Sequence, residues 1–234
     1  GRFYLRKIIL LLAAILFLIP KVSAETVSLG VEKIYDTYAY FYDQDQDKYR
    51  YVYAEKYSFN NNLAYCLELG KKIYGGIYTP TTSFDALNIS EEKLEKLKLI
   101  IYYGYEYPGH NTDAYFMAAQ ELIWNEMSNI SLSWVESLIP SKVVDVSKEK
   151  KEILNLIESH YKKPSFISNS IEYTLGDTLS IEDSNSVLNY FEVDNEYIEI
   201  IDNKLIIHPG FEKEEITLSK PSYTQNGFLL YTSG

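Results

Sequence analysis

The chain has 234 residues with 22 basic and 33 acidic side chains, which gives a formal charge of −11 at pH 7. This acidic excess argues against nucleic-acid binding, because phosphate contacts need patches of lysine and arginine. The hydrophobic share of 46% and the charged share of 24% are typical of a globular protein and exclude a disordered one. Tyrosine is frequent, with 23 residues, and favours β-strands, since aromatic side chains fit a pleated, half-buried surface.

Residues 1–24 are predicted to be a signal peptide. Basic residues precede an unbroken apolar run, residues 8–19, which is too short to span a bilayer comfortably. Pro20 ends the run, and Val22-Ser23-Ala24 fits a cleavage site; a buried helix or a retained anchor is the alternative. We therefore expect a secreted protein without membrane insertion after cleavage. Because the sequence does not begin with methionine and stops abruptly, we expect a monomeric module of a longer cell-surface protein.

Strands are predicted at the start of the mature chain. Tyrosines occupy every second position over residues 38–42 and again over 49–53, which is the period of a strand. The polar stretch 43–48 between them predicts a hairpin turn. Its three alternating aspartates resemble the start of a calcium loop. However, Lys48 stands where that loop needs glycine and Ala54 where it needs glutamate, so we expect a solvated turn.

The chain has one cysteine, Cys66, which lies in a short strand predicted over residues 63–68. A single cysteine in an exported protein cannot form an internal disulfide. It is therefore an intermolecular link, a reactive thiol or a small buried hydrophobic side chain.

Three helices are predicted next, over residues 90–104, 112–127 and 147–162, from their caps and apolar periodicity. Together with the strands they predict an α+β domain over residues 25–163. Pro164 follows the last helix and marks the predicted boundary, because proline ends a helix.

Residues 164–234 read as short strands only. One hairpin is expected around Asp202-Asn203, and further strands include residues 228–230. The number and spacing of these strands predict an all-β immunoglobulin-like sandwich, which we interpret as a stalk domain.

Gln120 has an unusual place in the helix predicted over residues 112–127. Apolar positions such as Phe116 and Ile123 lie on both sides of it, so its amide is in the middle of the apolar stripe. A buried amide without partners costs about 1–3 kcal/mol. Either the side chain bonds to nearby backbone, or a thiolate attacks its carbonyl carbon, expels ammonia and leaves a less polar thioester. Cys66 holds the only thiol of the sequence.

Three motifs carry a resemblance to a known family. They are Ala64-Tyr65-Cys66-Leu67-Glu68, Gly104-Tyr105-Glu106-Tyr107-Pro108-Gly109 and Ala118-Ala119-Gln120-Glu121-Leu122-Ile123-Trp124. In this order they resemble the aromatic-Cys-aliphatic strand, the Gly-Tyr-Pro turn and the T-Q-x-A-I-W-type helix in the thioester domain of Gram-positive surface adhesins. The resemblance covers roughly residues 30–163. Ala119 and Leu122 stand where the helix motif has threonine and alanine.

The resemblance implies a mechanism and a partner. The family forms an internal Cys–Gln thioester without a cofactor or metal, here between Cys66 and Gln120. A primary amine, typically a lysine side chain on a host surface or matrix protein, opens this bond and becomes linked through an amide. The chain would then be a cell-wall-attached adhesin for host attachment and a single-use covalent binder without turnover.

Supporting residues are suggested by proximity in the sequence. Tyr65 and Trp124 are candidates for walls that keep water from the acyl group; ordinary core is the favoured alternative for each. His110, in the loop before the glutamine helix, is a candidate base for the incoming amine; a solvated loop histidine is the alternative.

Two other functions stay open. The chain could be a noncovalent adhesin with an inert Cys66. It could also be a secreted cysteine hydrolase that uses Cys66 with His110 or His160, which requires an electropositive setting or a helix N-terminus at the thiol. A strand cysteine in an acidic chain fits that requirement poorly.

Overall fold

The structure is a computed structural model. The predicted signal peptide, residues 1–24, lies outside the described residues. Within the described part of the chain, no helix is both long and apolar enough to cross a membrane. The described residues are 27–59, 61–73, 77–78, 85–167, 169–213, 215–220 and 227–230.

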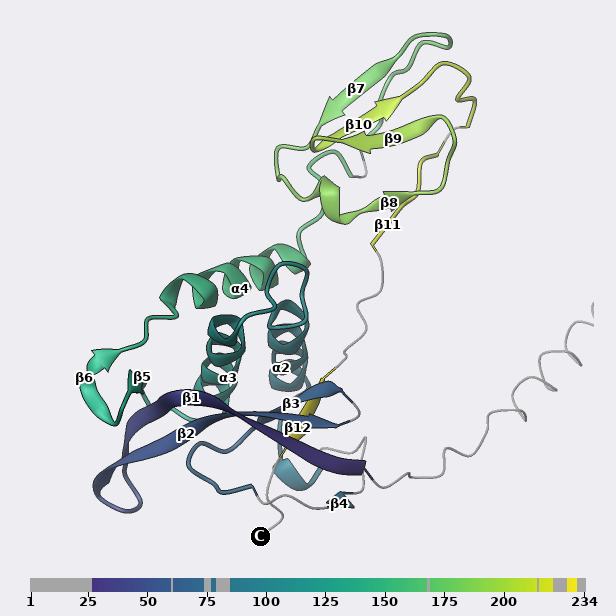
Figure 1. Ribbon diagram of the computed structural model, residues 1–234. Coiled ribbons are helices and arrows are strands. Elements are labelled where there is room, and N and C mark those ends of the chain that lie inside the picture. The colour runs from purple at the N-terminus through teal and green to yellow at the C-terminus, as the bar shows by residue number, and fades with distance from the viewer. Residues whose placement is uncertain are drawn as a thin grey trace, which may run out of the picture.

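A seven-stranded sheet is the base of the larger part of the molecule, which we call the main unit (Figure 1). The strand order is β12-β3-β2-β1-β5-β6, and β4 also pairs with β1. Every pair is antiparallel except β12 with β3. The strands are β1 (Val27–Asp43), β2 (Lys48–Phe59), β3 (Asn62–Cys66), β4 (Ile77–Tyr78), β5 (Leu132–Glu136), β6 (Ile139–Val143) and β12 (Phe228–Leu230).

The predicted tyrosine hairpin is confirmed by the pairing of β1 with β2. Tyr40 lies opposite Tyr51 and Tyr42 opposite Tyr49, so these rings share one face of the hairpin. Phe41, which points to the other face, is buried. The loop between the strands is a turn, and among the described residues no group of three or more His, Cys, Asp or Glu side chains could hold a metal ion.

Three helices cover one face of the sheet (Figure 1), and they confirm the predicted helices to within a few residues. They are α2 (Glu91–Tyr103), α3 (Asp113–Met127) and α4 (Ser147–His160). Ser90 and Thr112 cap the first two helices. Their hydroxyls accept hydrogen bonds from the backbone N–H of the third helical residue, Lys93 and Tyr115 respectively. Gly104 ends α2 where only a glycine fits, since a Cβ there would lie 3.0 Å from the Cβ of Ala119.

The central helix, α3, is more buried than an amphipathic stripe would require. Every residue from Phe116 to Trp124 is buried, so this stretch is enclosed on all sides by α2, α4 and the sheet. Gln120 lies in the middle of the enclosed stretch, with 2% of its surface exposed.

The smaller part of the molecule, which we call the second unit, consists of short strands. β7 (Leu179–Glu182), β10 (Lys204–Ile207) and β9 (Ile198–Ile201) form a three-stranded antiparallel sheet, and β8 (Glu192–Val193) pairs with β11 (Leu218–Ser219). The all-β character agrees with the prediction. The described strands alone do not show the predicted immunoglobulin-like sandwich, which stays a prediction.

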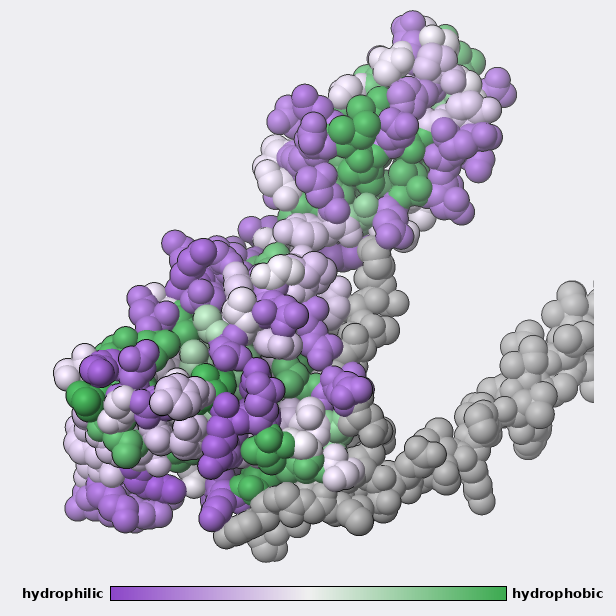
Figure 2. Space-filling view, in the orientation of Figure 1, coloured by the Kyte–Doolittle hydropathy of each residue, from purple (hydrophilic) through white to green (hydrophobic). Residues whose placement is uncertain are grey.

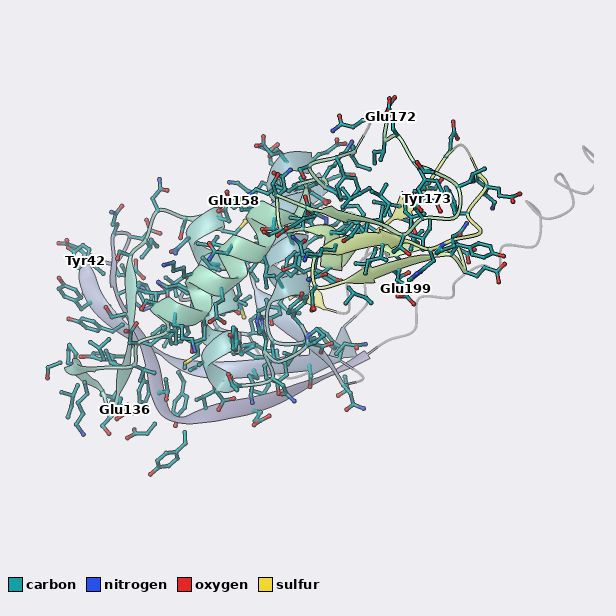
Figure 3. The ribbon with its side chains drawn as sticks, turned by 90° about the horizontal axis from the view of Figure 1, so that it is seen from above. Tyr42, Glu136, Glu158, Glu172, Tyr173 and Glu199 are labelled. Atoms are coloured by element: carbon teal, nitrogen blue, oxygen red, sulfur yellow. The ribbon has the colours of Figure 1, made fainter. Side chains whose placement is uncertain are left out.

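The second unit has a small core. Among the described residues, its buried core cluster contains five hydrophobic side chains, and several other large apolar side chains stay exposed, among them Leu175 at 68% and Ile201 at 47%. Figure 2 shows hydrophobic residues gathered on one face of this unit. Figure 3 shows Tyr173 and Glu199 of the second unit at one end of the molecule and Tyr42 and Glu136 of the main unit at the other.

One strand expected in the second unit belongs to the main unit. β12 pairs in parallel with β3, with Leu230 opposite Cys66, and the Leu67 N–H donates to the Leu230 carbonyl at 2.9 Å. The chain thus leaves the main unit after α4, builds the second unit and returns. A strand pattern records alternation along the chain and not the sheet that the strand joins, so this pairing could not be read from the sequence. The predicted boundaries after residues 24 and 163 stay predictions.

Candidate functional site

The structure brings Cys66 and Gln120 together in the core of the main unit. Cys66 is the last residue of β3, Gln120 is in the middle of α3, and both are buried, with 6% and 2% of their surface exposed. The Cys66 N–H donates to Gln120 Oε1 at 2.9 Å, and Gln120 Nε2 donates to the Cys66 carbonyl at 2.8 Å. The amide is therefore paired with backbone, and that backbone belongs to the one cysteine of the chain.

The Cys66 N–H and C=O can bind the Gln120 amide because the β2–β3 ladder ends before it reaches them. Successive residues of a strand direct their N–H and C=O groups to opposite edges. Leu67 donates to β12, so Cys66 points its groups toward β2. The ladder between β2 and β3 has already ended at the pair Tyr57 and Ala64. The Gln120 amide therefore takes the position of the next ladder partner.

These hydrogen bonds prepare the amide for attack at its carbon. A donor on Oε1 draws electron density from the carbonyl and would stabilise an oxyanion formed there, which is the arrangement found in oxyanion holes. Nε2 is held on the Cys66 carbonyl, so the carbonyl carbon is fixed beside the residue that carries the thiol. Both residues are buried, and burial strengthens such electrostatic interactions.

The thiol itself is strongly disfavoured as a thiolate. Burial raises the pKa of Cys66, and the negative charges of Glu55 and Glu68 raise it further. The pKa shift is thus opposite to the one that cysteine hydrolases need, and Cys66 ends a strand rather than starting a helix. The geometry suits a thiol that reacts once with a fixed neighbour.

Aromatic residues lie on both sides of Gln120 along α3. Tyr65 is 1% exposed and stacks on Phe116, one helical turn before Gln120, with ring centroids 5.2 Å apart. Trp124, one turn after it, stacks on Trp134 at 5.9 Å. The Tyr65 hydroxyl and the Trp124 indole nitrogen are buried without a hydrogen-bond partner among the described residues. Both candidates for the walls therefore line the buried stretch that holds the amide.

His110 is buried, which corrects the alternative of a solvated loop residue. Its Nδ1 lies 2.8 Å from the Tyr103 carbonyl, and its ring stacks on Tyr115 with centroids 3.8 Å apart. His160 Nδ1 lies 2.7 Å from the Tyr103 hydroxyl, and burial, together with the Lys220 charge, lowers its pKa. The contacts described for both histidines are with this aromatic cluster and not with Cys66 or Gln120.

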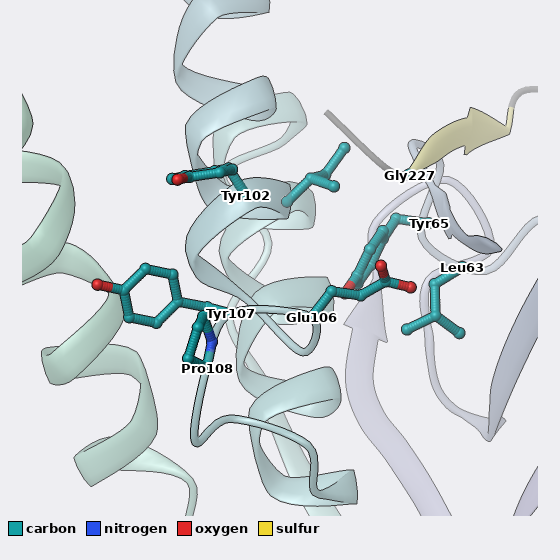
Figure 4. Close-up of a pocket in the computed structure, with 8 residues that line it drawn as sticks. Leu63, Tyr65, Tyr102, Glu106, Tyr107, Pro108 and Gly227 are labelled. Carbon is teal, nitrogen blue, oxygen red and sulfur yellow. The ribbon is translucent and has the colours of Figure 1, made fainter. Parts of the chain in front are cut away.

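A pocket of about 90 Å³ opens on the other side of β3 (Figure 4). Figure 4 shows the Glu106 carboxylate beside Tyr65 at this pocket. Neighbouring side chains of a strand point to opposite faces, so the Tyr65 side of β3 is not the side of the Cys66 thiol. The pocket is lined by Leu63, Tyr65, Ile101, Tyr102, Glu106, Tyr107, Pro108 and Gly227.

Two acidic residues near the site were not singled out from the sequence. Glu121 follows Gln120, is 7% exposed, and accepts hydrogen bonds from Trp134 Nε1 at 3.0 Å and from Lys150 Nζ at 2.6 Å. Glu55, on β2, accepts from the Tyr57 hydroxyl at 2.5 Å. The sequence holds a signal for Glu121, because it is an acidic residue within an apolar helical run. The place of Glu55 near the site could be recognised only once the strand pairing was known.

The comparisons with known proteins agree with this geometry. A family model described as "Thioester domain" matches residues 63–163. Among solved structures, the chain is similar to the thioester domain of the Staphylococcus aureus TIE protein, with a TM-score of 0.61 and 21% sequence identity; the match covers 79% of this chain and 78% of that one. At this identity the likeness speaks for the fold. No curated protein matches the chain.

Proposed function

This chain contains a thioester domain, and from that premise we propose that Cys66 and Gln120 join in an internal thioester that captures a primary amine of a partner protein. The observation that carries the proposal is the pair of hydrogen bonds between the Gln120 amide and the Cys66 backbone. They hold the electrophilic amide on the backbone of the residue that carries the single thiol of the chain. The reaction needs no cofactor.

Formation of the thioester is an acyl transfer within the chain. Cys66 Sγ attacks the Gln120 carbonyl carbon, and the negative charge that develops on Oε1 is stabilised by the Cys66 N–H. The C–N bond then breaks, and Nε2 leaves as ammonia with the proton that the thiol gave up. Fixing both groups in the core supplies the proximity that such a reaction needs.

Capture of the partner breaks the C–S bond that the first step formed and makes a new C–N bond. A neutral amine attacks the thioester carbon, the C–S bond breaks, and the amine becomes an amide of Gln120. The thiolate is the better leaving group, because a thiol with a pKa of about 8.5 is far more acidic than an amine N–H. The resulting amide does not reopen, so the protein acts once, as a covalent binder.

We further propose that the partner is a host surface or matrix protein that presents a lysine, and that the chain is an adhesin on a Gram-positive cell wall. The supports are the predicted signal peptide, the acidic composition and the family to which the domain belongs. The second unit then serves as a spacer in a longer surface protein, for which an immunoglobulin-like arrangement remains our proposal.

Intact mass tests the thioester directly. The natively prepared protein should be lighter by one ammonia than its sequence, and incubation with methylamine should add one methylamine. Cys66→Ala and Gln120→Ala should each restore the full mass and abolish methylamine addition. Gln46→Ala, which removes an exposed glutamine of the hairpin turn, is the matched control and should keep both signals.

Two outcomes would favour the other functions. A full-mass protein that still binds its partner after Cys66→Ala would be a noncovalent adhesin. A full-mass protein with a readily alkylated thiol and repeated turnover of a substrate would be a cysteine hydrolase.

A further inference from the structure

We propose that Glu55 is the proton acceptor for the chemistry at Cys66, an inference that rests on the proposed thioester. Nothing in the sequence motifs points to this residue. The reasons are its register opposite Cys66, its fixed carboxylate and the need of a buried thiol for a base.

The strand register brings Glu55 to the reacting side of β3. β2 and β3 pair Phe59 with Asn62 and Tyr57 with Ala64. The ladder ends at the pair Tyr57 and Ala64, and the same register continued two residues along each strand sets Glu55 at the level of Cys66. In an antiparallel pair, opposite residues point to the same face of the sheet, so the carboxylate and the thiol share a face. The Gln120 amide lies at the edge of β3 toward β2 at this level.

The carboxylate is held in place by its own strand. The Tyr57 hydroxyl donates to Glu55 Oε2 at 2.5 Å, and Tyr57 is 7% exposed while Glu55 is half-buried. From β1, Lys33 lies opposite Glu55 in the register, and its Nζ is 4.8 Å from the centroid of the Tyr53 ring. Glu68, which follows β3, is the other carboxylate whose charge acts on Cys66.

A buried neutral thiol needs such an acceptor. Burial and the two carboxylates keep the Cys66 proton on sulfur at physiological pH, so sulfur can attack only if the proton leaves as the C–S bond forms. The buried His110 and the half-buried His160 bond within the aromatic cluster around Tyr103. Glu55 lies on the strand beside β3, two residues from the last ladder pair, and its charge acts on the thiol.

Protons are conserved in both steps. In the first, Glu55 takes the proton from Sγ as the C–S bond forms and returns it to Nε2 as the C–N bond breaks, so ammonia leaves. In the second, Glu55 takes a proton from the attacking neutral amine as the new C–N bond forms. It passes that proton to Sγ as the C–S bond breaks, which restores the thiol.

The test is the isosteric variant Glu55→Gln, followed by intact mass. We expect the fraction of chains that have lost ammonia to fall sharply. We expect any thioester that forms to react with methylamine about 100-fold more slowly, the usual loss for a general base. Glu55→Asp should recover part of the rate.

Glu68→Gln separates proton transfer from simple electrostatics. Both glutamates raise the pKa of the thiol through their charge, so removing either charge makes the thiol more acidic. If charge alone mattered, both variants would react as fast as the wild type or faster. We expect that behaviour for Glu68→Gln and the opposite for Glu55→Gln.

The outcomes also separate this inference from the proposed thioester. A wild-type protein of full mass would overturn the thioester itself. A wild type that loses ammonia, together with a folded Glu55→Gln that loses ammonia to the same extent and reacts with the same rate and pH profile, would overturn the role of Glu55 alone. Should Glu55→Gln fail to fold by thermal unfolding, Tyr57→Phe decides: it frees the carboxylate without changing its charge, and an unchanged methylamine rate would contradict the proposal.

Discussion

At the scale of single residues, the environment of Cys66 fits the proposed thioester. The thiol is enclosed in the core, and burial together with nearby carboxylates raises its pKa. The Cys66 backbone binds both polar atoms of the Gln120 amide. A reagent from solvent therefore meets a protonated, shielded sulfur, whereas the Gln120 amide is held on the backbone of the same residue.

The raised pKa gives a prediction for the variant Gln120→Ala, in which the thiol stays free. A group whose pKa is raised by folding stabilises the fold fully below its unfolded pKa, about 8.5 for a cysteine. That contribution is lost as the pH rises further. The free energy of unfolding in urea should thus fall above about pH 8.5. The free energy of unfolding of the double variant Cys66→Ala/Gln120→Ala should fall less over the same pH range. Subtracting the two curves removes the contribution of the tyrosines, which both variants share. Parallel curves would contradict the shift.

At the scale of secondary-structure elements, Glu121 fixes the helix that carries Gln120. Its carboxylate accepts from Trp134 on β5 and from Lys150 on α4, so one buried side chain joins three elements. Gln120 and Glu121 are neighbours on α3. A rotation of the helix that moved one of them would also break the bonds of the other.

Glu121→Ala should destabilise the fold strongly, because it leaves a buried indole N–H without its acceptor and Lys150 without its counter-ion. We expect a loss of about 2–4 kcal/mol in the free energy of unfolding, measured by urea denaturation. Lys148→Ala is the control on the same helix as Lys150, since the Lys148–Glu152 pair is exposed and should contribute below about 1 kcal/mol. Equal losses in both variants would refute a special role for Glu121.

Local elements could be predicted from the sequence, and their partners could not. Periodicity and caps located the tyrosine hairpin and the three helices, because these signals lie within a few residues of one another. The polar amide of Gln120 within an apolar helical stripe could be recognised for the same reason. The roles of Glu55 and Glu121 could not be predicted, because they depend on strand pairing and on contacts across three elements. The buried position of His110 likewise depends on Tyr103 and Tyr115 packing around it.

At the scale of the whole molecule, the second unit is inserted between α4 and β12. The last described strand closes the edge of β3 beside Cys66, where Leu230 is opposite the cysteine. Gly227, just before it, lies so close to α2 that a Cβ would be 2.5 Å from Ile101 Cγ2. The main unit is therefore complete only with residues from both ends of the described chain.

Removing β12 should open the site without removing either reacting residue. A chain that stops after residue 220 should lose much of its protection against iodoacetamide at Cys66 when compared with the full chain, both carrying Gln120→Ala. The measure is the alkylated fraction by mass over time under native conditions. The matched control is the full chain with an exposed substitution in the second unit, Ile201→Thr, which should keep the slow rate. An equally slow rate in the shortened chain would show that β12 does not shield the thiol.

The late position of β12 also sets an order of events during biosynthesis. Chains are made from the amino end, so Cys66 and Gln120 are both synthesised long before the strand that covers the edge of β3. Until residues 228–230 emerge, the edge of β3 beside Cys66 is uncovered. Synthesis through residue 230 is therefore a checkpoint, and we expect nascent chains shorter than this to carry an unsealed site.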